Sequence, residues 1–175
     1  MMGDRADILI VYRYPSGKYD VIDLHTHWMG SSFDLCFKDY MRKAREFVID
    51  QYHLLASPIV VVSYLIFLDG YTKCIELRKQ LPFIFPCIPD IYPRLGIRHT
   101  DGYGYIIVLP NDMDILGEKI RDSLKEIPYR IIKLKIGYNG FSDEDLEYIR
   151  NGELYKVLGK YKIVKDEVFS LPIEK

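Results

Sequence analysis

Three side chains in the segment Tyr19–Trp28 have the residue types of a metal or acid–base site. Asp23, His25 and His27 stand at every second position of a stretch that otherwise resembles a strand. Successive side chains of a strand point to opposite faces of the sheet, so these three share one face. A carboxylate with two imidazoles can bind a divalent cation or transfer protons. Asp23, His25 and His27 are therefore candidate metal ligands, and Asp23 and His25 are also candidate catalytic residues.

The spacing of these three side chains along the strand is also compatible with a purely structural role for them. Side chains two positions apart in a strand lie roughly 6.5–7 Å apart, which suits two ligands of one ion better than three. The alternative is a buried strand whose histidines form only local hydrogen bonds. The expected cofactor of a metal site is Mg²⁺ or Mn²⁺, and no segment has the pattern of a haem, iron–sulfur, nicotinamide or flavin site. Three cysteines without a CxxC pair favour neither a disulfide framework nor a zinc finger.

Basic residues that could neutralise phosphate occur in three further segments, as Arg94, Arg98, Lys73 and Arg130. Arg94 and Arg98 lie with His99 in a glycine-containing stretch, where charge-assisted hydrogen bonds and free backbone N–H groups could bind an anion. His99 is a third candidate catalytic residue, and Asp90 is a candidate further metal ligand. The alternative for each basic residue is an ordinary solvated surface charge.

The first half of the chain predicts a hairpin, a helix and a second pair of strands. Residues Ile8–Tyr14 and Tyr19–Trp28 flank the turn Pro15–Lys18 and predict an antiparallel hairpin. Apolar residues recur at helical spacing over Phe33–Tyr52. The expected later elements are strands at Ile59–Leu68 and Tyr71–Leu77, joined by the turn Asp69-Gly70, and an extended, packed connector at Leu81–Pro93.

The second half predicts strands alternating with two helices. The expected strands are Tyr105–Leu109, Tyr129–Ile136 and Tyr161–Ile173. One helix is expected from Asp112 or Asp114 to about Glu126. Another begins after Ser142, whose spacing to Asp145 resembles a capping box, and extends to about Leu158.

These elements predict an α+β fold with a mixed or antiparallel sheet and helices packed mainly on one face, as in an RRM-like or other two-layer sandwich. We expect one domain over residues 1–175. An alternative division is a core at 8–136 with a helix–strand extension at 137–175.

Composition narrows the classes of function. The chain has 175 residues, 49% of them hydrophobic, and a formal net charge of -1, so overall charge gives no argument for nucleic acid or an anionic membrane. The polar start predicts no secretory signal, and the apolar run Ile59–Leu68 is too short to cross a bilayer. We expect a cytoplasmic protein with no membrane partner. Scarce amides with abundant Lys and Glu favour a thermophilic, archaeal source.

A longer pattern covers Tyr19 to Pro110. Its parts, in order, are Asp23–His25, Phe33–Tyr52, Ile59–Ser63, Gly70–Leu77, Arg94–Gly102 and Tyr105–Leu109. Together they resemble the archaeo-eukaryotic primase-type polymerase superfamily, which implies two-metal nucleotidyl transfer on an RRM-like sheet and a role in DNA replication. The chain departs from that pattern, because His25 stands at the second metal carboxylate and the stretch after Gly70 has no histidine. The resemblance therefore implies a diverged or inactive member.

Two hypotheses follow from the sequence. The first is a divalent-metal-dependent protein that acts on, or binds, nucleotides or nucleic acid. The second is a non-catalytic subunit or protein-interaction module with an aromatic-rich surface and no metal site. They differ in whether Asp23 and His25 face a cleft that Arg94, Arg98 or His99 also lines.

Overall fold

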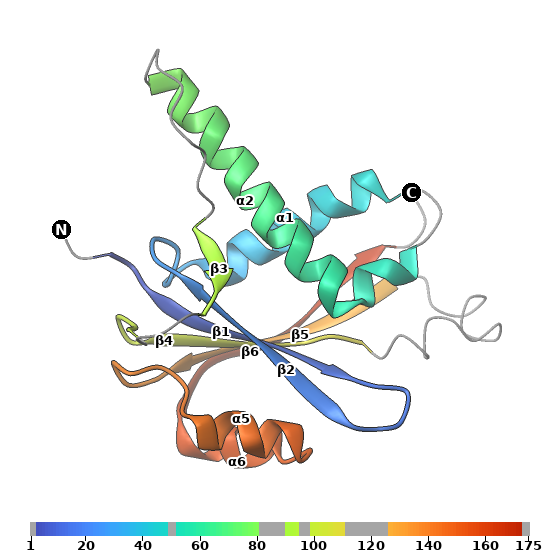
Figure 1. Cartoon of the computed structure of the whole chain (residues 1–175), viewed down its shortest axis with the longest axis vertical. Coiled ribbons are helices and arrows are strands. Elements are labelled where there is room, and N and C mark those ends of the chain that lie inside the picture. Colours follow the sequence, from blue (N-terminus) through green and yellow to red (C-terminus); the bar gives the residue numbers. More distant parts are fainter. Residues whose placement is uncertain (1–2, 49–51, 81–89, 95–98, 111–125, 173–175) are drawn as a thin grey trace.

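A six-stranded sheet forms the centre of the protein (Figure 1). The computed structural model describes residues 3–48, 52–80, 90–94, 99–110 and 126–172. Strands follow the order β3-β2-β1-β4-β5-β6; β1 and β4 are parallel, and all other neighbours are antiparallel. Their bounds are β1 Ala6–Arg13, β2 Tyr19–Thr26, β3 Ile91–Pro93, β4 Tyr103–Val108, β5 Glu126–Lys135 and β6 Lys162–Pro172. The predicted α+β class with a mixed sheet is confirmed.

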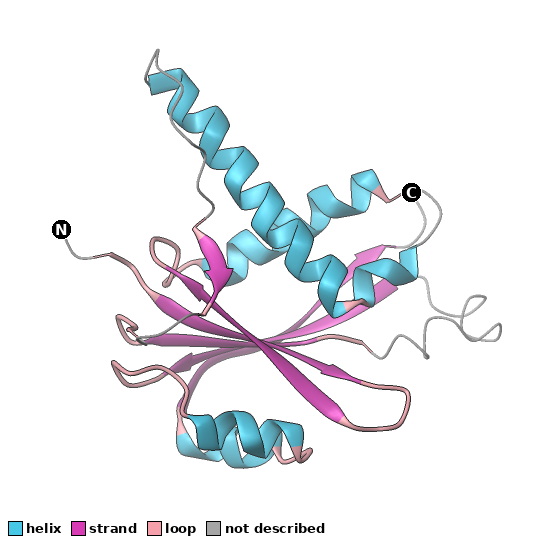
Figure 2. Ribbon diagram, viewed as in Figure 1, coloured by secondary structure: helices cyan, strands magenta, loops and turns pink. Residues whose placement is uncertain are grey.

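Helices cover both faces of this sheet (Figure 2). On one face lie α1 (Phe33–Phe47) and α2 (Pro58–Gln80), preceded by the short 3₁₀ helix η1 (Tyr52–Ala56). On the other face lie α5 (Asp143–Arg150) and α6 (Leu154–Lys160). The expectation that the helices pack mainly on one face is wrong: α1 and the helices after Ser142, which were predicted, lie on opposite faces, so the fold has three layers and not two.

The hairpin of β1 and β2 contributes to both hydrophobic cores. The two strands pair antiparallel, as the sequence predicted, from Ala6 opposite Thr26 to Arg13 opposite Tyr19. In β1, Ile8 and Ile10 pack into the core under α1 and α2, while Leu9 and Val11 pack into the core under α5 and α6. A strand that is apolar on both faces therefore stands in the middle of the sheet, not at an edge.

Residues 58–80 form one helix of 23 residues, so the prediction of two strands there is wrong. The β-branched run at the start of α2 favours a strand by propensity. However, Val61, Leu65 and Leu68 recur at helical spacing and are buried against the α1/α2 core. Packing of that face outweighs propensity, and the expected turn at Asp69-Gly70 is continuous helix.

The C-terminal elements confirm the predicted cap and correct the predicted helix length. The Ser142 side chain accepts a hydrogen bond from the backbone N–H of Asp145, whose own side chain accepts from the backbone N–H of Ser142. The expected continuous helix to Leu158 is divided into α5 and α6. The division falls at Gly152, whose φ of 76° lies in the left-handed region that ends helices.

Other boundaries differ by a few residues or cannot be compared. The first helix ends at Phe47, earlier than the expected Tyr52. Of the connector Leu81–Pro93, residues 81–89 lie outside the described part, and the last three form β3 at a sheet edge, where proline is tolerated. The helix expected before Glu126 also lies outside it, and Glu126 itself begins β5.

None of the helices in the described part of the chain is long and apolar enough to cross a membrane.

Candidate functional site

The carboxylate of Asp23 meets the guanidinium of Arg94, so the structure brings two predicted site residues together. Arg94 Nη1 donates to Oδ2 of Asp23 and to Oδ2 of Asp7, at 2.7 Å in each case. The backbone N–H of Arg94 also donates to the carbonyl oxygen of Asp23, at 3.0 Å. Asp7 was not predicted, because the first strand was expected to begin at Ile8. We call Asp7, Asp23 and Arg94 the carboxylate–arginine cluster.

The carboxylate–arginine cluster is closed off from solvent. Asp7 is 1% exposed, and the side chains of Arg94 and Asp23 are 5% and 16% exposed. The backbone N–H of Phe141 donates to Asp7 Oδ2 at 3.0 Å, and Gly140 lies so close that a Cβ there would be 2.7 Å from the same oxygen. The loop before α5 thus covers Asp7, and the cluster is better suited to holding this loop on the hairpin than to admitting a substrate.

His25 lies beside the cluster as a buried imidazole. It is directly opposite Asp7 in the β1–β2 register, and its ring packs against Tyr92 with centroids 5.4 Å apart. Burial is the main reason that its pKa is lowered; the nearby charge of Asp7 acts in the opposite direction. His25 is therefore neutral at pH 7, as a metal ligand or a general base would have to be.

His27 does not converge with Asp23 and His25 on one point. Its Nδ1 accepts a hydrogen bond from Arg5 Nε at 3.3 Å, and its ring packs edge-on against Trp28. Within the residues that the structure describes, no three His, Cys, Asp or Glu side chains gather in a way that could hold a metal ion. Asp23, His25 and His27, which are all described, therefore do not form the group of ligands that the sequence predicted.

Asp90 belongs to a second buried polar cluster, on the side of the sheet that α2 covers. Its carboxylate accepts hydrogen bonds from the Thr26 hydroxyl and from the backbone N–H groups of His27 and Trp28, at 2.8–3.1 Å. Lys73 Nζ lies 3.1 Å from Asp90 and 3.6 Å from Asp69. The backbone N–H groups of Asp90 and Ile91 in turn donate to Asp69.

This second cluster explains why a carboxylate can sit in the middle of α2. Asp69 is fully buried, and its other oxygen accepts from the Tyr40 hydroxyl at 2.7 Å. A buried charge must be paired and hydrogen-bonded, and Asp69 meets that requirement by joining α1, α2 and the start of β3. We therefore assign Asp69 and Asp90 a structural role.

The outward side of α2 carries a row of exposed side chains without charge. Its members, at a spacing of four residues, are Ile59, Ser63, Phe67, Tyr71 and Ile75. Ile59 is 73% exposed, Phe67 and Tyr71 are each 57% exposed, and Ile75 is 39% exposed. Side chains four residues apart are neighbours on a helix surface, and each step turns the row by about 40°, so these five wind across the outward side from Ile59 on one flank to Ile75 on the other; they are called the α2 row below.

Two grooves flank the α2 row, one on each half. A groove of about 420 Å³ lies between α1 and the C-terminal half of α2, with Phe47, Tyr71 and Ile75 in its lining. A second, of about 360 Å³, adjoins the N-terminal half and is lined in part by Ser63 and Phe67. Two stacked ring pairs, Phe47 with Tyr64 and Phe67 with Tyr71, stiffen this surface.

Comparison with known proteins gives no relative. No family model, curated protein or solved structure matches the chain. Two of the segments that carry its resemblance to primase-type polymerases, Ile59–Ser63 and Gly70–Leu77, were expected to be strands and instead lie within α2.

The remaining predicted phosphate-binding residues are engaged within the chain or lie outside the described part. Arg130 forms a two-pronged ion pair with Asp166 at 2.7 and 3.0 Å, on the exposed surface of β5 and β6. His99 packs edge-on against Tyr138, with ring centroids 4.6 Å apart. Arg98 lies outside the described residues.

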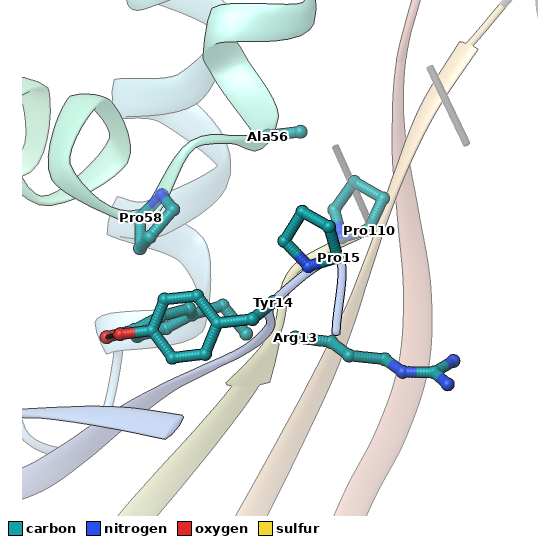
Figure 3. A pocket seen from close by; sticks show the side chains of 7 residues that line it. Arg13, Tyr14, Pro15, Ala56, Pro58 and Pro110 are labelled. Carbon is teal, nitrogen blue, oxygen red and sulfur yellow. Dashed lines mark hydrogen bonds between the residues drawn. The ribbon is translucent and has the colours of Figure 1, made fainter. Parts of the chain in front are cut away.

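A pocket of about 200 Å³ at the β1–β2 turn offers little chemistry (Figure 3). Pro15, Pro58 and Pro110 surround it together with Tyr14, while the guanidinium of Arg13 points away from the prolines. Its lining is mostly rigid and apolar, so it fits a small apolar group better than a phosphate.

Proposed function

We propose that this protein is a non-catalytic interaction module that binds a protein partner through the α2 row. The observation that carries the proposal is the exposure of Ile59, Phe67, Tyr71 and Ile75 on a strip that bears no charge. Contiguous exposed apolar surface on a soluble domain marks a site of interaction. Depletion of charge and enrichment in aromatic residues are the compositional features of an interface core.

The composition of α2 supports this proposal independently. No Asp, Glu, Lys or Arg occurs from Pro58 to Leu68, and apolar side chains point in all directions from that half of the helix. A helix that is apolar all round is normally buried on all sides. In this structure α1 and the sheet cover its inner side through Val61, Leu65 and Leu68, so the outer side is the part that a partner would cover.

The nucleotide hypothesis has weaker support in the described residues. Arg94, Lys73 and Arg130, which were predicted to contact phosphate, each face a carboxylate of the same chain. Arg94 Nη2 has no hydrogen-bond partner, but it is buried. A phosphate would therefore have to displace an internal ion pair before it could bind to any of these three residues.

Site-specific photo-crosslinking in the cells that make the protein tests the proposal. A photoreactive phenylalanine analogue replaces Ser63 in the α2 row or, as a matched control, the exposed Glu147 on α5. We expect an adduct of defined mass from position 63, none from position 147, and loss of the adduct when Phe67→Asp is added. Equal labelling from both positions would refute the proposal.

Calorimetry with Mn²⁺ and a nucleoside triphosphate supplies the opposite test. If the protein is only an interaction module, titration with Mn²⁺ and the nucleoside triphosphate should give no saturable heat of binding. Saturable binding that the double variant Asp23→Ala/His25→Ala abolishes, with the fold intact by circular dichroism, would overturn the proposal in favour of the nucleotide hypothesis.

A further inference from the structure

We infer that two copies of this chain associate edge to edge through β6, so that their six-stranded sheets join into one continuous sheet. The inference concerns a different surface from the α2 row and does not depend on the proposed function. β6 is the last strand of the sheet, and among the described residues it pairs only with β5. The free side of an edge strand offers unpaired N–H and C=O groups to another strand.

The pairing of the neighbouring strands shows which backbone groups of β6 point outward. In an antiparallel ladder the N–H and C=O of a residue point to the same side, and that side alternates along the strand. Ser170 stands opposite Pro128, which has no N–H to donate, so the backbone groups of Ser170 point away from β5. The hydrogen bond from the Leu109 N–H to the Val11 carbonyl, toward β1, gives the same alternation when it is carried across β4 and β5.

Three residues of β6 therefore direct both backbone groups away from the sheet: Asp166, Val168 and Ser170. None of these N–H and C=O groups has a hydrogen-bond partner in the part of the chain that the structure describes. The next outward carbonyl, that of Pro172, accepts from Arg45 Nε at 2.8 Å, as the same alternation requires. The edge available to another strand is thus the segment from Asp166 to Ser170.

One register pairs all three of these residues with a second copy. A two-fold axis at Val168 places Val168 opposite its own copy and Asp166 opposite the second copy's Ser170, twice by symmetry. Each pair exchanges two hydrogen bonds, whereas a shift by two residues in either direction leaves only two such pairs. The ends also agree, because Pro172, which has no N–H, comes opposite Val164, which the ladder with β5 skips.

The same register keeps like charges apart. Val168 is 67% exposed in the single chain, and at the axis it is covered by the second copy's Val168. The other opposite pairs each set a charged side chain against an uncharged one: Asp166 with Ser170, Glu167 with Phe169, and Lys165 with Leu171. A shift that moves the axis to Glu167 would set this carboxylate against its own copy, which destabilises a strand pair.

Arg42 adds attraction between the copies. Its guanidinium lies 5.1 Å from the centre of the Phe169 ring, and its side chain is 58% exposed. Because the second copy's Glu167 comes opposite Phe169 on the same face of the sheet, Arg42 lies beside that carboxylate. An isologous interface must be complementary to itself. The β6 edge meets that condition in its backbone groups and in its charges, so we name a second copy as its occupant.

The helices leave room for the second copy on both sides of the joined strands. The Phe33 and Phe37 rings of α1 pack on Tyr105 of β4 and Tyr129 of β5, with centroids 5.3 and 5.4 Å apart. With each α1 over its own β5, three strand spacings, or about 14 Å, separate the two helices, more than the roughly 8–10 Å of helices in contact. On the opposite face, the exposure of Val168 shows that α5 and α6 do not cover this part of β6.

The two-fold arrangement stops at two copies. Both β6 edges are used, and the remaining edge strand of each sheet is β3, which has three residues and ends in Pro93. A short edge strand with proline is a poor template for another chain. We therefore expect a closed dimer and no larger assembly through the sheet.

Sedimentation equilibrium of the purified chain is the first test. One pair of edge strands buries little surface, so the 20.6 kDa chain should approach twice its mass as concentration rises through roughly the micromolar range. Val168→Lys should weaken the dimer roughly 10-fold or more, because it sets two like charges together at the axis. The control Tyr155→Lys changes a side chain on α6 that is also 67% exposed and should leave dissociation unchanged. A chain that stays monomeric, or a dimer that Val168→Lys leaves intact, would overturn the inference.

Proline substitution separates the contribution of the backbone from that of the side chain. Val168→Pro removes the N–H that each copy donates at the axis and should weaken the dimer roughly 10-fold. Val168→Thr keeps the N–H and the branched shape and should leave the dimer intact. Proline is tolerated where the N–H of an edge strand faces away from the sheet, so circular dichroism should show that both variants fold. Equal dissociation of the two variants would exclude strand pairing as the mode of contact.

Disulfide trapping tests the register. Val168→Cys should form a reducible dimer well above the background of the unaltered chain, because the two copies of this position face each other with Cα atoms roughly 5.5 Å apart. Asp166→Cys and Ser170→Cys should each form much less, since their two copies are displaced by four residues, or roughly 13 Å, along the strands. More efficient trapping from position 166 or 170 than from position 168 would rule out the register.

Photo-crosslinking distinguishes a second copy from a strand of another protein. A photoreactive phenylalanine analogue at position 168 should give an adduct of twice the mass of the chain in the cells that make it. An adduct of another mass would overturn the second copy and assign the β6 edge to a different protein. Val168→Lys should leave the adduct from position 63 in the α2 row unchanged, so failure of this inference is distinguishable from failure of the proposed function.

Discussion

Replacing Arg94 with methionine should destabilise the protein strongly, because it removes the positive charge between two buried carboxylates. Arg94 donates to both Asp7 and Asp23 at 2.7 Å, and its side chain is 5% exposed. Removal of one partner from a buried charge cluster costs about 3–5 kcal/mol. For a domain of this size, each kcal/mol shifts the melting temperature by about 2–4 °C. We expect a fall of roughly 6–20 °C.

Two comparisons make the measurement specific. Arg130→Met breaks an ion pair with similar hydrogen bonds on the exposed surface, and it should cost less than about 1 kcal/mol. The triple variant Arg94→Met/Asp7→Asn/Asp23→Asn should recover at least half of the loss, since no uncompensated charge remains buried. Thermal and urea unfolding followed by circular dichroism give all four free energies. If Arg94→Met costs no more than Arg130→Met, the cluster does not stabilise the fold, and Arg94 regains its place as a candidate ligand-binding residue.

Three smaller perturbations test the loop over Asp7, the N-terminal cap of α5 and the protonation of His25. Gly140→Ala, at a φ of 73° and with a new Cβ 2.7 Å from Asp7, should cost about 1–3 kcal/mol in urea unfolding, whereas Gly137→Ala, which meets nothing within 4 Å, should cost less than about 0.5 kcal/mol. Ser142→Ala should cost about 1 kcal/mol through loss of the α5 cap; no measurable change would contradict the cap's contribution. Burial lowers the folded-state pKa of His25, so its stabilising contribution is present above the ordinary pKa of 6.5 and is lost as pH falls from that value through the lower folded-state pKa. Unfolding free energies from pH 8 to 5 should therefore decline less in His25→Gln, and an unchanged slope would show that another group titrates.

Much of the sheet could be predicted because its strands have strong local signals. The turn at Pro15–Lys18 and the apolar strands around it define the first hairpin, and the capping spacing at Ser142 defines the start of α5. These features depend on neighbours within a few residues. The end of α5 was missed because Gly152 was not recognised as a helix terminator.

The prediction of two strands where α2 stands was wrong for a different physical reason. Local propensity at Ile59–Val62 favours a strand, whereas the burial of Val61, Leu65 and Leu68 depends on α1 and the sheet, which the sequence does not display. One signal was available: Ile59, Phe67, Tyr71 and Ile75 are all apolar and stand at multiples of four residues, which makes them neighbours along one row of a helix. Reading that period of four would have predicted both the helix and its exposed row.

The candidate site was predictable in its residue types but not in its partners. Asp23 and Arg94 were both singled out, and they lie 2.7 Å apart. Their contact depends on β3 pairing with β2, and the role of Asp7 depends on the loop at Phe141, which is far away in sequence. The local sequence identifies charged residues, whereas only the fold shows that they form ion pairs with one another within the chain.

The parallel pairing of β1 with β4 has a consequence for synthesis of the chain. Ala6 pairs with Tyr103, so the ribosome must add 97 further residues before the central strand gains its second neighbour. The hairpin is complete once Thr26 has been made, 77 residues before Tyr103, so at 5–20 residues per second it waits roughly 4–15 s with an apolar strand open on one edge. During that interval Arg94 has not been made for most of the time, and the charges of Asp7 and Asp23 still face water. In the nascent chain, Asp7 and Asp23 are thus polar groups that discourage the unpaired hairpin from pairing with another chain. In the folded protein the same carboxylates anchor a loop.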